Sequence, residues 1–312
     1  MSTSNKPAQS PWIKARYLVE YAGLKAALGL LNTLPTTTSL ALARGVGNLG
    51  YAFSGMRRRV SIENLRRTGV AGDAATARHL ARAAFSHMTQ LVVETIWARY
   101  TPGFVEKHVT LAIPAATQAL LNDREQGMLL ATGHIGNWEV AGLAAARRKS
   151  VVGLMRPMSN PYVDAMVQSL LPPGGFRLVP KHSPDIGRFA QYLREGSVLA
   201  LMIDQFAGER GMSVPFFGQP AQTHTAVALL HLVTRVPLVF GWCRRTGPLQ
   251  FKLRASEPIV IARTGRKQED VRAVLTRLNS ELERAIGEAP EQYMWGHRRW
   301  KPVKASVGNS EQ

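Results

Sequence analysis

The sequence predicts an α/β protein whose mostly parallel central sheet is flanked by helices and preceded by a helical N-terminal segment. Two observations support this fold class. From about residue 105, short apolar runs such as GMLLATG, KSVVGLM and GSVLALMID alternate with helical patterns, which is typical of parallel strands joined by helical crossovers. Before residue 100, apolar residues recur at helical spacing instead.

Three helices are expected in the first hundred residues. The first covers residues 17–34, and the second covers 39–53 after Pro35. The basic stretch RRRVSIENLRR is expected as a connector to the third helix, over 73–100. This third helix has the clearest helical period, with apolar residues on one face and Asp73 in the N-cap position.

The rest of the chain supplies the predicted sheet. VPLVFGWCRR and LQFKLRA are expected as adjacent strands joined by a Thr-Gly-Pro turn, and helices are expected over 160–171 and 268–286. We therefore predict a helical, membrane-associating region over 1–100, an α/β core over 101–305 and a tail over 306–312. The first two regions can also share one hydrophobic core.

The charge of the chain is its unusual bulk property. Lys and Arg number 39 against 21 Asp and Glu, a net charge of +18, which predicts attraction to a polyanion such as nucleic acid, an anionic membrane face or an acidic protein. The alternative is the compositional habit of an Ala- and Arg-rich proteome. Because the basic residues are scattered and no nucleic-acid module is visible, we expect no nucleic-acid partner.

The N-terminal segment favours contact with a membrane surface over insertion through it. The longest charge-free stretch, 26–43, contains Asn32, Pro35 and three consecutive threonines, and so makes a poor transmembrane helix. A helix over about 12–34 can lie in a bilayer surface, or it can pack on the protein's own core. The single cysteine, Cys243, excludes a disulfide framework and a multi-cysteine metal site, and we expect no metal or cofactor.

The stretch ATGHIGNWEVAG, residues 131–142, carries the clearest chemical signal. His134 follows an apolar run and therefore lies at the tip of a predicted strand, where sites form in sheets of this kind. Asn137 is in the N-cap position of the next helix. A turn at Gly136-Asn137 lets His134 fold back over Glu139 in the first helical turn. The alternative is an ordinary loop histidine beside a helix that begins with an acid.

A histidine held by a carboxylate can activate a hydroxyl. The carboxylate fixes the imidazole tautomer, and the second ring nitrogen then removes a proton from an attacking alcohol. The sequence has no G-x-S-x-G nucleophile elbow, and Cys243 lies inside a strand-like run. We therefore expect the hydroxyl of the acceptor to attack directly, without a covalent acyl-enzyme.

Four ordered blocks give the chain a family resemblance. HIGNWE at 134–139 resembles the H-x4-[DE] block of the glycerolipid and lysophospholipid acyltransferase superfamily, in the form typical of its bacterial lipid A late acyltransferase branch (lauroyl and myristoyl transferases). RPMSNPYVD at 156–164, DQFAGERGMSVPFFGQPAQTHT at 204–225 and PEQYMWGHRRWK at 290–301 are similar to three further blocks of that branch. The resemblance covers about residues 40–302.

The resemblance implies a glycerolipid acyltransferase-like fold and an O-acyltransferase that needs no cofactor. The donor would be acyl carrier protein or acyl-CoA, and the acceptor a hydroxyl of a membrane glycolipid at the cytoplasmic face of the inner membrane. His134 would be the general base and Glu139 its orienting partner. The positions assigned to substrate are Gly136, Asn137, Arg156, Asn160, Asp204 and Arg298. Backbone N–H groups near Gly136, or a basic side chain, would stabilise the oxyanion.

Several of these assignments have structural alternatives. Arg156 would bind a substrate phosphate or carboxylate, but it can equally form an internal ion pair. Asn160 can instead cap the following helix, and Arg298 can be solvated surface. Asp204 ends the run LALMID, at a second strand tip.

Two departures from the family pattern leave the acceptor open. Phe206-Ala207-Gly208 follows Asp-Gln where many relatives have a further acid, and LLPPGGFRL replaces a short arginine-containing turn. We expect a lipid A precursor, with another glycolipid or a lysophospholipid as the alternative acceptor. A non-enzymatic membrane- or nucleic-acid-binding protein is the rival interpretation. The charge of +18 suits an acidic carrier protein, a phosphorylated acceptor and an anionic membrane surface.

Overall fold

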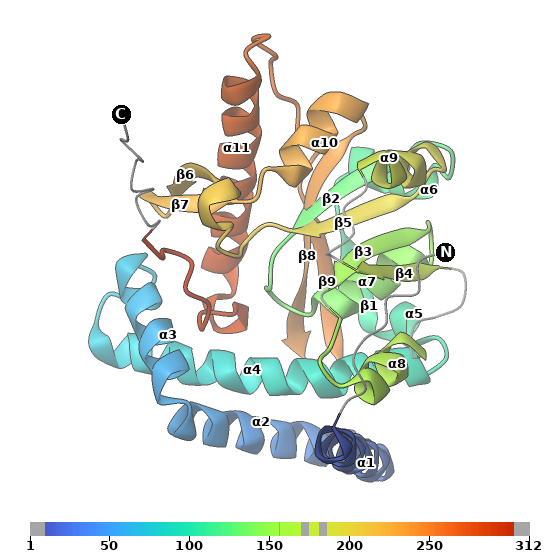
Figure 1. Ribbon diagram of the computed structural model, residues 1–312, viewed down its shortest axis with the longest axis vertical. Helices are drawn as coiled ribbons and strands as arrows, with labels where there is room; N and C mark the ends of the chain where they lie inside the picture. Colours follow the sequence, from blue (N-terminus) through green and yellow to red (C-terminus); the bar gives the residue numbers. More distant parts are fainter. Residues whose placement is uncertain (1–9, 156, 170–174, 181–185, 303–312) are drawn as a thin grey trace.

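The computed structural model describes residues 10–155, 157–169, 175–180 and 186–302. Within them, seven strands form a central sheet in the order β1-β9-β8-β2-β5-β3-β4 (Figure 1). The strands are β1 (Val109–Ala112), β2 (Met128–Thr132), β3 (Val151–Met155), β4 (Phe176–Pro180), β5 (Val198–Met202), β8 (Leu238–Gly247) and β9 (Gln250–Ala255). Neighbours are parallel except for β8 and β9, so the predicted fold class is confirmed.

Helices cover both faces of this sheet. One face packs against α5 (Phe104–His108), α6 (Ala115–Asn122) and α7 (Trp138–Ala146). The other packs against α9 (Ile186–Arg194), α10 (Ala226–Thr234) and α11 (Lys267–Glu288). The outlying elements are α8 (Pro161–Ser169), the hairpin of β6 (Met212–Phe216) and β7 (Gln219–Thr223), and the short helices η1 (Gly208–Arg210) and η2 (Pro290–Gln292).

Alternation along the strands separates the two faces. In β2, Leu129 and Ala131 are buried in the core on the α11 side. Met128 and Leu130 point to the α7 side, where they line a cavity. Because successive side chains of a strand point to opposite faces, a nearly continuous apolar run can fill a core on one side and shape a cavity on the other.

Four helices precede the sheet: α1 (Pro11–Thr33), α2 (Thr36–Phe53), α3 (Gly55–Arg67) and α4 (Ala74–Tyr100). The Asp73 side chain accepts hydrogen bonds from the backbone N–H groups of Ala75 and Thr76, which confirms the predicted N-cap. The core cluster of the α11 side also includes Leu65 and Ala81, so α3 and α4 share that core with the sheet.

The expectation of a connector at RRRVSIENLRR was wrong, because this stretch forms most of α3. Its buried residues are Ser61, Asn64 and Leu65. The Asn64 amide donates hydrogen bonds of 2.8 Å to the backbone oxygens of both Trp295 and His297. A helix with a narrow buried stripe can carry many charges on its solvated face, and the sequence pattern concealed it for that reason.

Helix α2 lies between α4 and solvent (Figure 1). A Cβ atom at Gly47 would stand 2.5 Å from the Ser86 Cα atom, so the two helices approach closely only because residue 47 is glycine. The opposite face of α2 leaves Val46 and Phe53 59% and 85% exposed. Among the described residues, no helix is long and apolar enough to cross a membrane.

Candidate functional site

The site lies at the carboxyl ends of two neighbouring parallel strands. β2 pairs with β5 through Thr132 and Met202, so the residues that follow each strand emerge side by side. The His134 ring contacts the Asp204 carboxylate, with 2.9 Å between Nδ1 and Oδ1. The backbone N–H of His134 donates to the other carboxylate oxygen, Oδ2, at 2.8 Å. Asp204 therefore fixes both the chain and the ring of the histidine.

The contact with Asp204 sets the imidazole tautomer. An ionised carboxylate only accepts hydrogen bonds, so Nδ1 carries the proton and Nε2 presents its lone pair. Burial by itself raises the pKa of the Asp204 carboxyl, but the charge of His134 and the hydrogen bonds from its ring and backbone outweigh burial and lower that pKa. Trp138 packs edge-on against the imidazole, with 5.0 Å between ring centroids.

Glu139 has a different partner from the one the sequence suggested. Its Oε2 accepts a hydrogen bond of 2.5 Å from Arg99 of α4, and Arg99 also donates to the backbone oxygen of Val167 in α8. The carboxylate on Nδ1 of His134 is Asp204 rather than the predicted Glu139, because Asp204 follows β5, the strand that pairs with β2. Glu139 still lines the same cavity as His134, where it joins α7 to α4 and α8.

The turn at residues 134–137 uses its own backbone donors. The Gly136 N–H donates to the Gln292 oxygen at 2.9 Å, and the Asn137 N–H donates to the Cys243 oxygen at 2.8 Å. Gly136 has φ +59°, and a Cβ atom there would lie 2.0 Å from the Cys243 oxygen, so only glycine fits. The Gly136 N–H is therefore used inside the fold and is not available to an oxyanion, while substrate contact by Gly136 stays a prediction.

Asn137 is a structural residue of the same turn. Its Oδ1 accepts from the Val140 N–H at 3.0 Å, which confirms the predicted N-cap of α7. Its Nδ2 donates to Glu94 Oε2 at 3.1 Å. The predicted substrate contact of Asn137 is wrong, because the residue is fully buried and both side-chain groups have partners.

A buried ion pair supports this turn from behind. Arg245 of β8 donates from Nη2 to Glu94 Oε2 at 2.8 Å, and its Nε also donates to Glu94. Burial raises the pKa of Glu94, and Arg245 partly opposes that rise. His87 donates from Nε2 to the Gly136 oxygen at 3.1 Å. Burial and the nearby Arg245 charge lower the pKa of His87 to about 3, so His87 is neutral at physiological pH.

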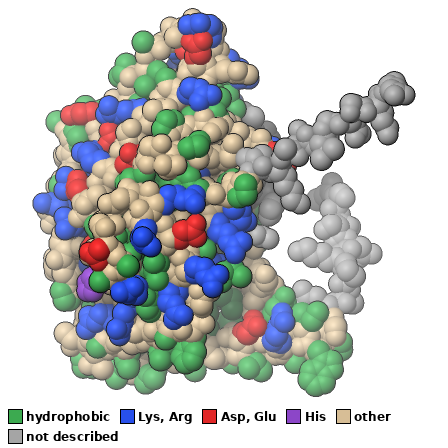
Figure 2. Space-filling model, turned by 90° about the vertical axis from the view of Figure 1, so that its left-hand side faces the viewer, with side chains coloured by type: hydrophobic (Ala, Val, Ile, Leu, Met, Phe, Trp, Pro, Cys, Tyr) green, Lys and Arg blue, Asp and Glu red, His purple; other side chains and the backbone are tan. Residues whose placement is uncertain are grey.

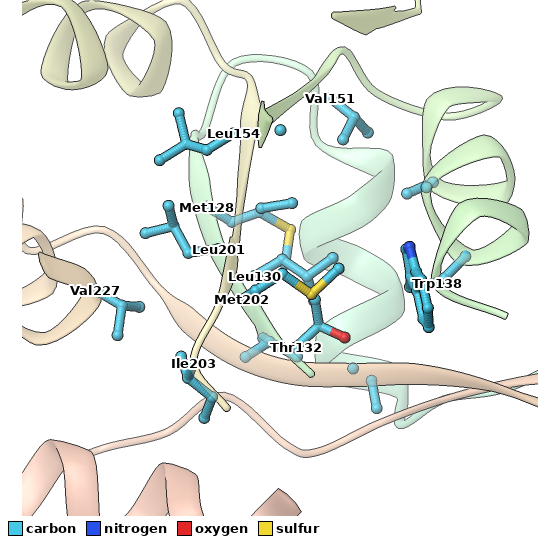
Figure 3. A pocket seen from close by; sticks show the side chains of 18 of the residues that line it. Met128, Leu130, Thr132, Trp138, Val151, Leu154, Leu201, Met202, Ile203 and Val227 are labelled. Carbon is cyan, nitrogen blue, oxygen red and sulfur yellow. The ribbon is translucent and has the colours of Figure 1, made fainter. Parts of the chain in front are cut away.

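An apolar cavity of about 550 Å³ opens beside His134. Figure 3 shows Met128, Leu130, Met202 and Thr132 directed into one space, with Trp138 on the side of α7. Small residues keep this space open: Gly153 of β3 and Ala200 of β5 are in register and both line it. The polar lining residues nearest His134 in sequence or by strand pairing are Thr132, Glu139 and Gln205. The volume is within the range of small-ligand pockets, about 300–1,000 Å³.

Two of the remaining predicted substrate residues, Asn160 and Arg298, are not among the residues that line this cavity. Asn160 is buried; its Nδ2 donates to the Tyr17 oxygen at 2.9 Å and its Oδ1 accepts from the Tyr162 N–H at 3.0 Å. It therefore caps α8 and ties it to α1, so its predicted substrate contact is wrong. Arg298 is exposed. Arg156 lies outside the described residues.

The C-terminal block contributes His297 and Tyr293, which the sequence interpretation missed, and Arg299, which it placed with Arg298 at a phosphate or at the carrier protein. His297 Nε2 accepts from the Phe206 N–H at 2.8 Å; burial lowers the pKa of His297, although the Asp204 carboxylate opposes this. Burial, together with the nearby Asp204 charge, raises the pKa of Tyr293. Arg299 is 2% exposed and donates to Thr223 Oγ1 at 2.7 Å. Tyr293, His297 and Arg299 thus all lie close enough to Asp204 for its charge to affect their pKa values.

Two other chemistries lack a place among the described residues. No cluster of three or more His, Cys, Asp or Glu residues suited to a metal ion occurs there. The Cys243 thiol is fully buried, and burial raises its pKa, so it is not an accessible thiolate. The polar groups that line the cavity are those of Thr117, Thr132, His134, Glu139, Gln205, His224 and Arg254.

Three comparisons relate the chain to known proteins. A model of the family described as bacterial lipid A biosynthesis acyltransferase matches residues 8–302. The lipid A biosynthesis lauroyltransferase of Escherichia coli (strain K12) is 25% identical over 290 residues, covering 92% of each chain. The crystal structure of 1-acyl-sn-glycerophosphate acyltransferase PlsC from Thermotoga maritima is 13% identical with a TM-score of 0.34, covering 78% of this chain and 96% of that chain.

Acid should destabilise the fold through His87. Because its folded pKa of about 3 is below the ordinary 6.5, the unfolded chain binds the proton more readily. The stability held by the neutral ring is present above pH 6.5 and is lost as the pH falls below it. Between pH 7 and 5 this single group lowers the unfolding free energy by about 2 kcal/mol. Denaturant titrations of His87→Gln should show a pH dependence smaller by that amount.

His79→Gln is the matched control, because His79 lies on the same helix but is exposed. It should keep the wild-type dependence between pH 7 and 5. An unchanged pH dependence in His87→Gln would show that another group governs acid stability.

Proposed function

The chain belongs to the bacterial lipid A biosynthesis acyltransferase family and is an acyltransferase. We propose that it moves a fatty acyl chain from a thioester donor to a hydroxyl of a lipid A precursor. The donor is acyl carrier protein or acyl-CoA. The observation that carries the proposal is the His134–Asp204 pair at the mouth of an apolar cavity. A base beside a space for an acyl chain is the arrangement that acyl transfer to an alcohol needs.

The reaction follows from the tautomer of His134. With Nδ1 held by Asp204, Nε2 takes the proton of the acceptor hydroxyl as its oxygen attacks the thioester carbon. The C–O bond forms, the C–S bond breaks, and the imidazolium returns the proton to the departing thiolate. Asp204 stabilises the imidazolium in between. A covalent route through Cys243 is disfavoured, because its thiol is buried and protonated.

Replacement of the pair tests this mechanism directly. His134→Ala and Asp204→Asn should each lower kcat by about 10²- to 10⁴-fold, because each removes the positioned base or its tautomer. Acyl transfer from acyl carrier protein to a lipid A precursor is measured by mass spectrometry. Glu139→Gln should cost less, since Glu139 is paired with Arg99.

Circular dichroism and thermal unfolding should show that all three variants fold. Near-normal turnover of His134→Ala in folded protein would exclude the base. A loss in Glu139→Gln equal to that in Asp204→Asn would instead return the orienting role to Glu139.

The length of β2 that lines the cavity, from Met128 to Thr132, is close to that of a medium-length acyl chain. From Thr132 to Met128, β2 rises about 13 Å at about 3.3 Å per residue. An extended chain of twelve carbons is about 14 Å long when each C–C bond of about 1.5 Å advances about 1.3 Å. The Escherichia coli relative is named a lauroyltransferase, and we extend a chain of similar length to this enzyme. Ala200, in register with Leu130 and Gly153, lies halfway along the cavity.

A larger side chain at residue 200 should make the enzyme prefer donors with a shorter acyl chain. Ala200→Leu places a branched side chain across the cavity, so kcat/KM for a twelve-carbon donor should fall by at least about tenfold relative to an eight-carbon donor. Competition between the two acyl donors measures the ratio. Ala119→Leu makes the same change on the exposed side of α6 and should leave the ratio alone. An equal loss for both donors would argue against this cavity as the acyl site.

We extend the proposal to location: the enzyme docks on the cytoplasmic face of the inner membrane through α1 and α2. The exposed apolar residues of these helices are Trp12, Ile13, Leu18, Val19, Leu30, Leu42, Val46, Leu49 and Phe53. The four on α2 recur at helical spacing along one face. Figure 2 has hydrophobic side chains along its lower edge, where α1 and α2 lie in Figure 1, and Lys and Arg side chains above them.

This outer face combines the two attractions that hold a peripheral protein on an anionic bilayer. Its apolar side chains gain from burial among acyl chains. Lys14, Arg16, Lys25 and Arg44 are exposed on the same two helices and favour anionic headgroups. The acceptor lipid would then reach the cavity from the membrane, and the acidic carrier protein from the solvent side.

Charge placed on this face should release the protein from vesicles. The double variant Val46→Glu with Phe53→Glu should lower binding to phosphatidylethanolamine–phosphatidylglycerol vesicles at least about tenfold, since two apolar contacts are lost. Cosedimentation measures the bound fraction. Val260→Glu alters another exposed valine, between β9 and α11, and should bind normally. Unchanged binding of the double variant would exclude this face.

A further inference from the structure

Thr132 has a side chain that the fold does not use. It is the last residue of β2 and precedes His134 by two positions. The residue lines the cavity and is 7% exposed, while its Oγ1 atom is buried and has no hydrogen-bond partner among the described residues. A buried hydroxyl without a partner lowers stability, and such groups in native proteins call for an explanation.

The reaction needs a donor of the kind that Thr132 offers. When the acceptor oxygen attacks, the carbonyl oxygen of the thioester becomes an oxyanion that hydrogen bonds must stabilise. The backbone donors of the turn do not supply them: the His134 N–H bonds to Asp204, and those of Gly136 and Asn137 bond to the Gln292 and Cys243 oxygens. The Ile135 N–H bonds to the Gly133 oxygen, so the N–H groups of residues 134–137 are all used within the fold, and a cavity side chain can provide the hydrogen bond.

Two side-chain donors near His134 can be compared. Gln205 follows Asp204 and lines the cavity; its residue is partly exposed, so solvent can satisfy its amide. The Thr132 hydroxyl is buried and unpaired. The second cavity hydroxyl, Thr117 Oγ1, already donates to the Ser256 oxygen at 2.7 Å. Of these three side chains, the Thr132 hydroxyl is therefore the one whose hydrogen bond is left for the substrate.

Thr132 and His134 both line the cavity, so one bound carbonyl group can contact both side chains. Thr132 ends β2 and the chain turns at His134, where the Ile135 N–H donates to the Gly133 oxygen at 2.8 Å. The attacking oxygen held by Nε2 and the carbonyl oxygen held by Oγ1 are both bonded to the same carbon of the tetrahedral intermediate, so the two side chains act on one reacting group from the same cavity. Figure 3 shows the Thr132 hydroxyl directed to the side of Trp138, whose ring contacts His134.

We propose that Thr132 is a catalytic residue whose hydroxyl donates a hydrogen bond to the thioester carbonyl oxygen as it becomes negative. A change between staggered χ1 positions is the only movement that Oγ1 needs to reach a carbonyl oxygen bound in the cavity that Thr132 lines. Thr132 keeps its proton throughout; the proton of the acceptor goes to His134 and then to the leaving thiol. This inference rests on the acyl transfer proposed above.

Thr132→Val tests the proposal because valine keeps the shape and lacks the hydroxyl. kcat should fall about 10²-fold, as for the loss of one oxyanion donor, with KM little changed because the contact is made in the transition state. The midpoint of thermal unfolding should be equal or higher, since an unpaired buried oxygen is removed. Thr132→Ser should restore kcat to within about threefold of wild type.

Thr89→Val is the matched control with the opposite expectation. The Thr89 hydroxyl on α4 donates to the Ala43 oxygen at 2.6 Å, remote from the cavity residues. This variant should unfold at a lower temperature and keep the wild-type kcat. If the wild type and Thr89→Val show no acyl transfer, the proposed function fails, whatever the behaviour of Thr132.

With acyl transfer established, two results would overturn the role of Thr132. The first is a wild-type kcat in Thr132→Val. The second is a fall in kcat for Gln205→Leu but not for Thr132→Val, which would assign the donor to Gln205. A lower unfolding midpoint in Thr132→Val, unrescued activity in Thr132→Ser and a matching rise in KM would together indicate a packing role instead.

Discussion

The contact between Gly136 and the Cys243 carbonyl is the constraint on which the site depends. A turn buried this deeply has to satisfy its backbone polar groups inside the protein, and it does so through β8 and the Gln292 oxygen. Any side chain at residue 136 would collide with the Cys243 oxygen, 2.0 Å from the position of a Cβ atom. The backbone of the turn therefore holds the architecture, and side chains are left to perform the chemistry.

The pairing of β2 with β5 places a carboxylate, that of Asp204, beside His134. Asp204 is seventy positions from His134 in the chain, yet register between the strands brings it under the ring. The sequence indicated both strand tips, since apolar runs end there. It did not indicate which strands are neighbours, because strand order depends on how crossovers pack rather than on local pattern. A spacing rule therefore favoured Glu139, the acid nearest in sequence, over Asp204.

The sequence predicted features that depend on neighbouring residues, such as helix caps, but not contacts between residues far apart in the chain. Asp73 and Asn137 cap helices as predicted, because a cap needs only a side chain and the two or three residues that follow it. The helix α3 escaped notice because few of its side chains are buried. Its anchor, Asn64, binds oxygens more than two hundred positions away, and no periodicity within thirteen residues can show such a contact.

Asn137 and Thr132 illustrate how structural and chemical roles separate. Both are polar residues of the same strand–turn–helix segment, and the sequence favoured Asn137 for contact with substrate. The hydrogen bonds reverse the order: Asn137 has partners for both of its side-chain groups, whereas the Thr132 hydroxyl has none in the part of the chain that the structure describes. A fold selected only for stability would place an apolar residue at position 132. Residues that lower the stability of a fold occur mainly at functional sites. The unpaired Thr132 hydroxyl therefore indicates a catalytic role more strongly than the paired Asn137 amide does.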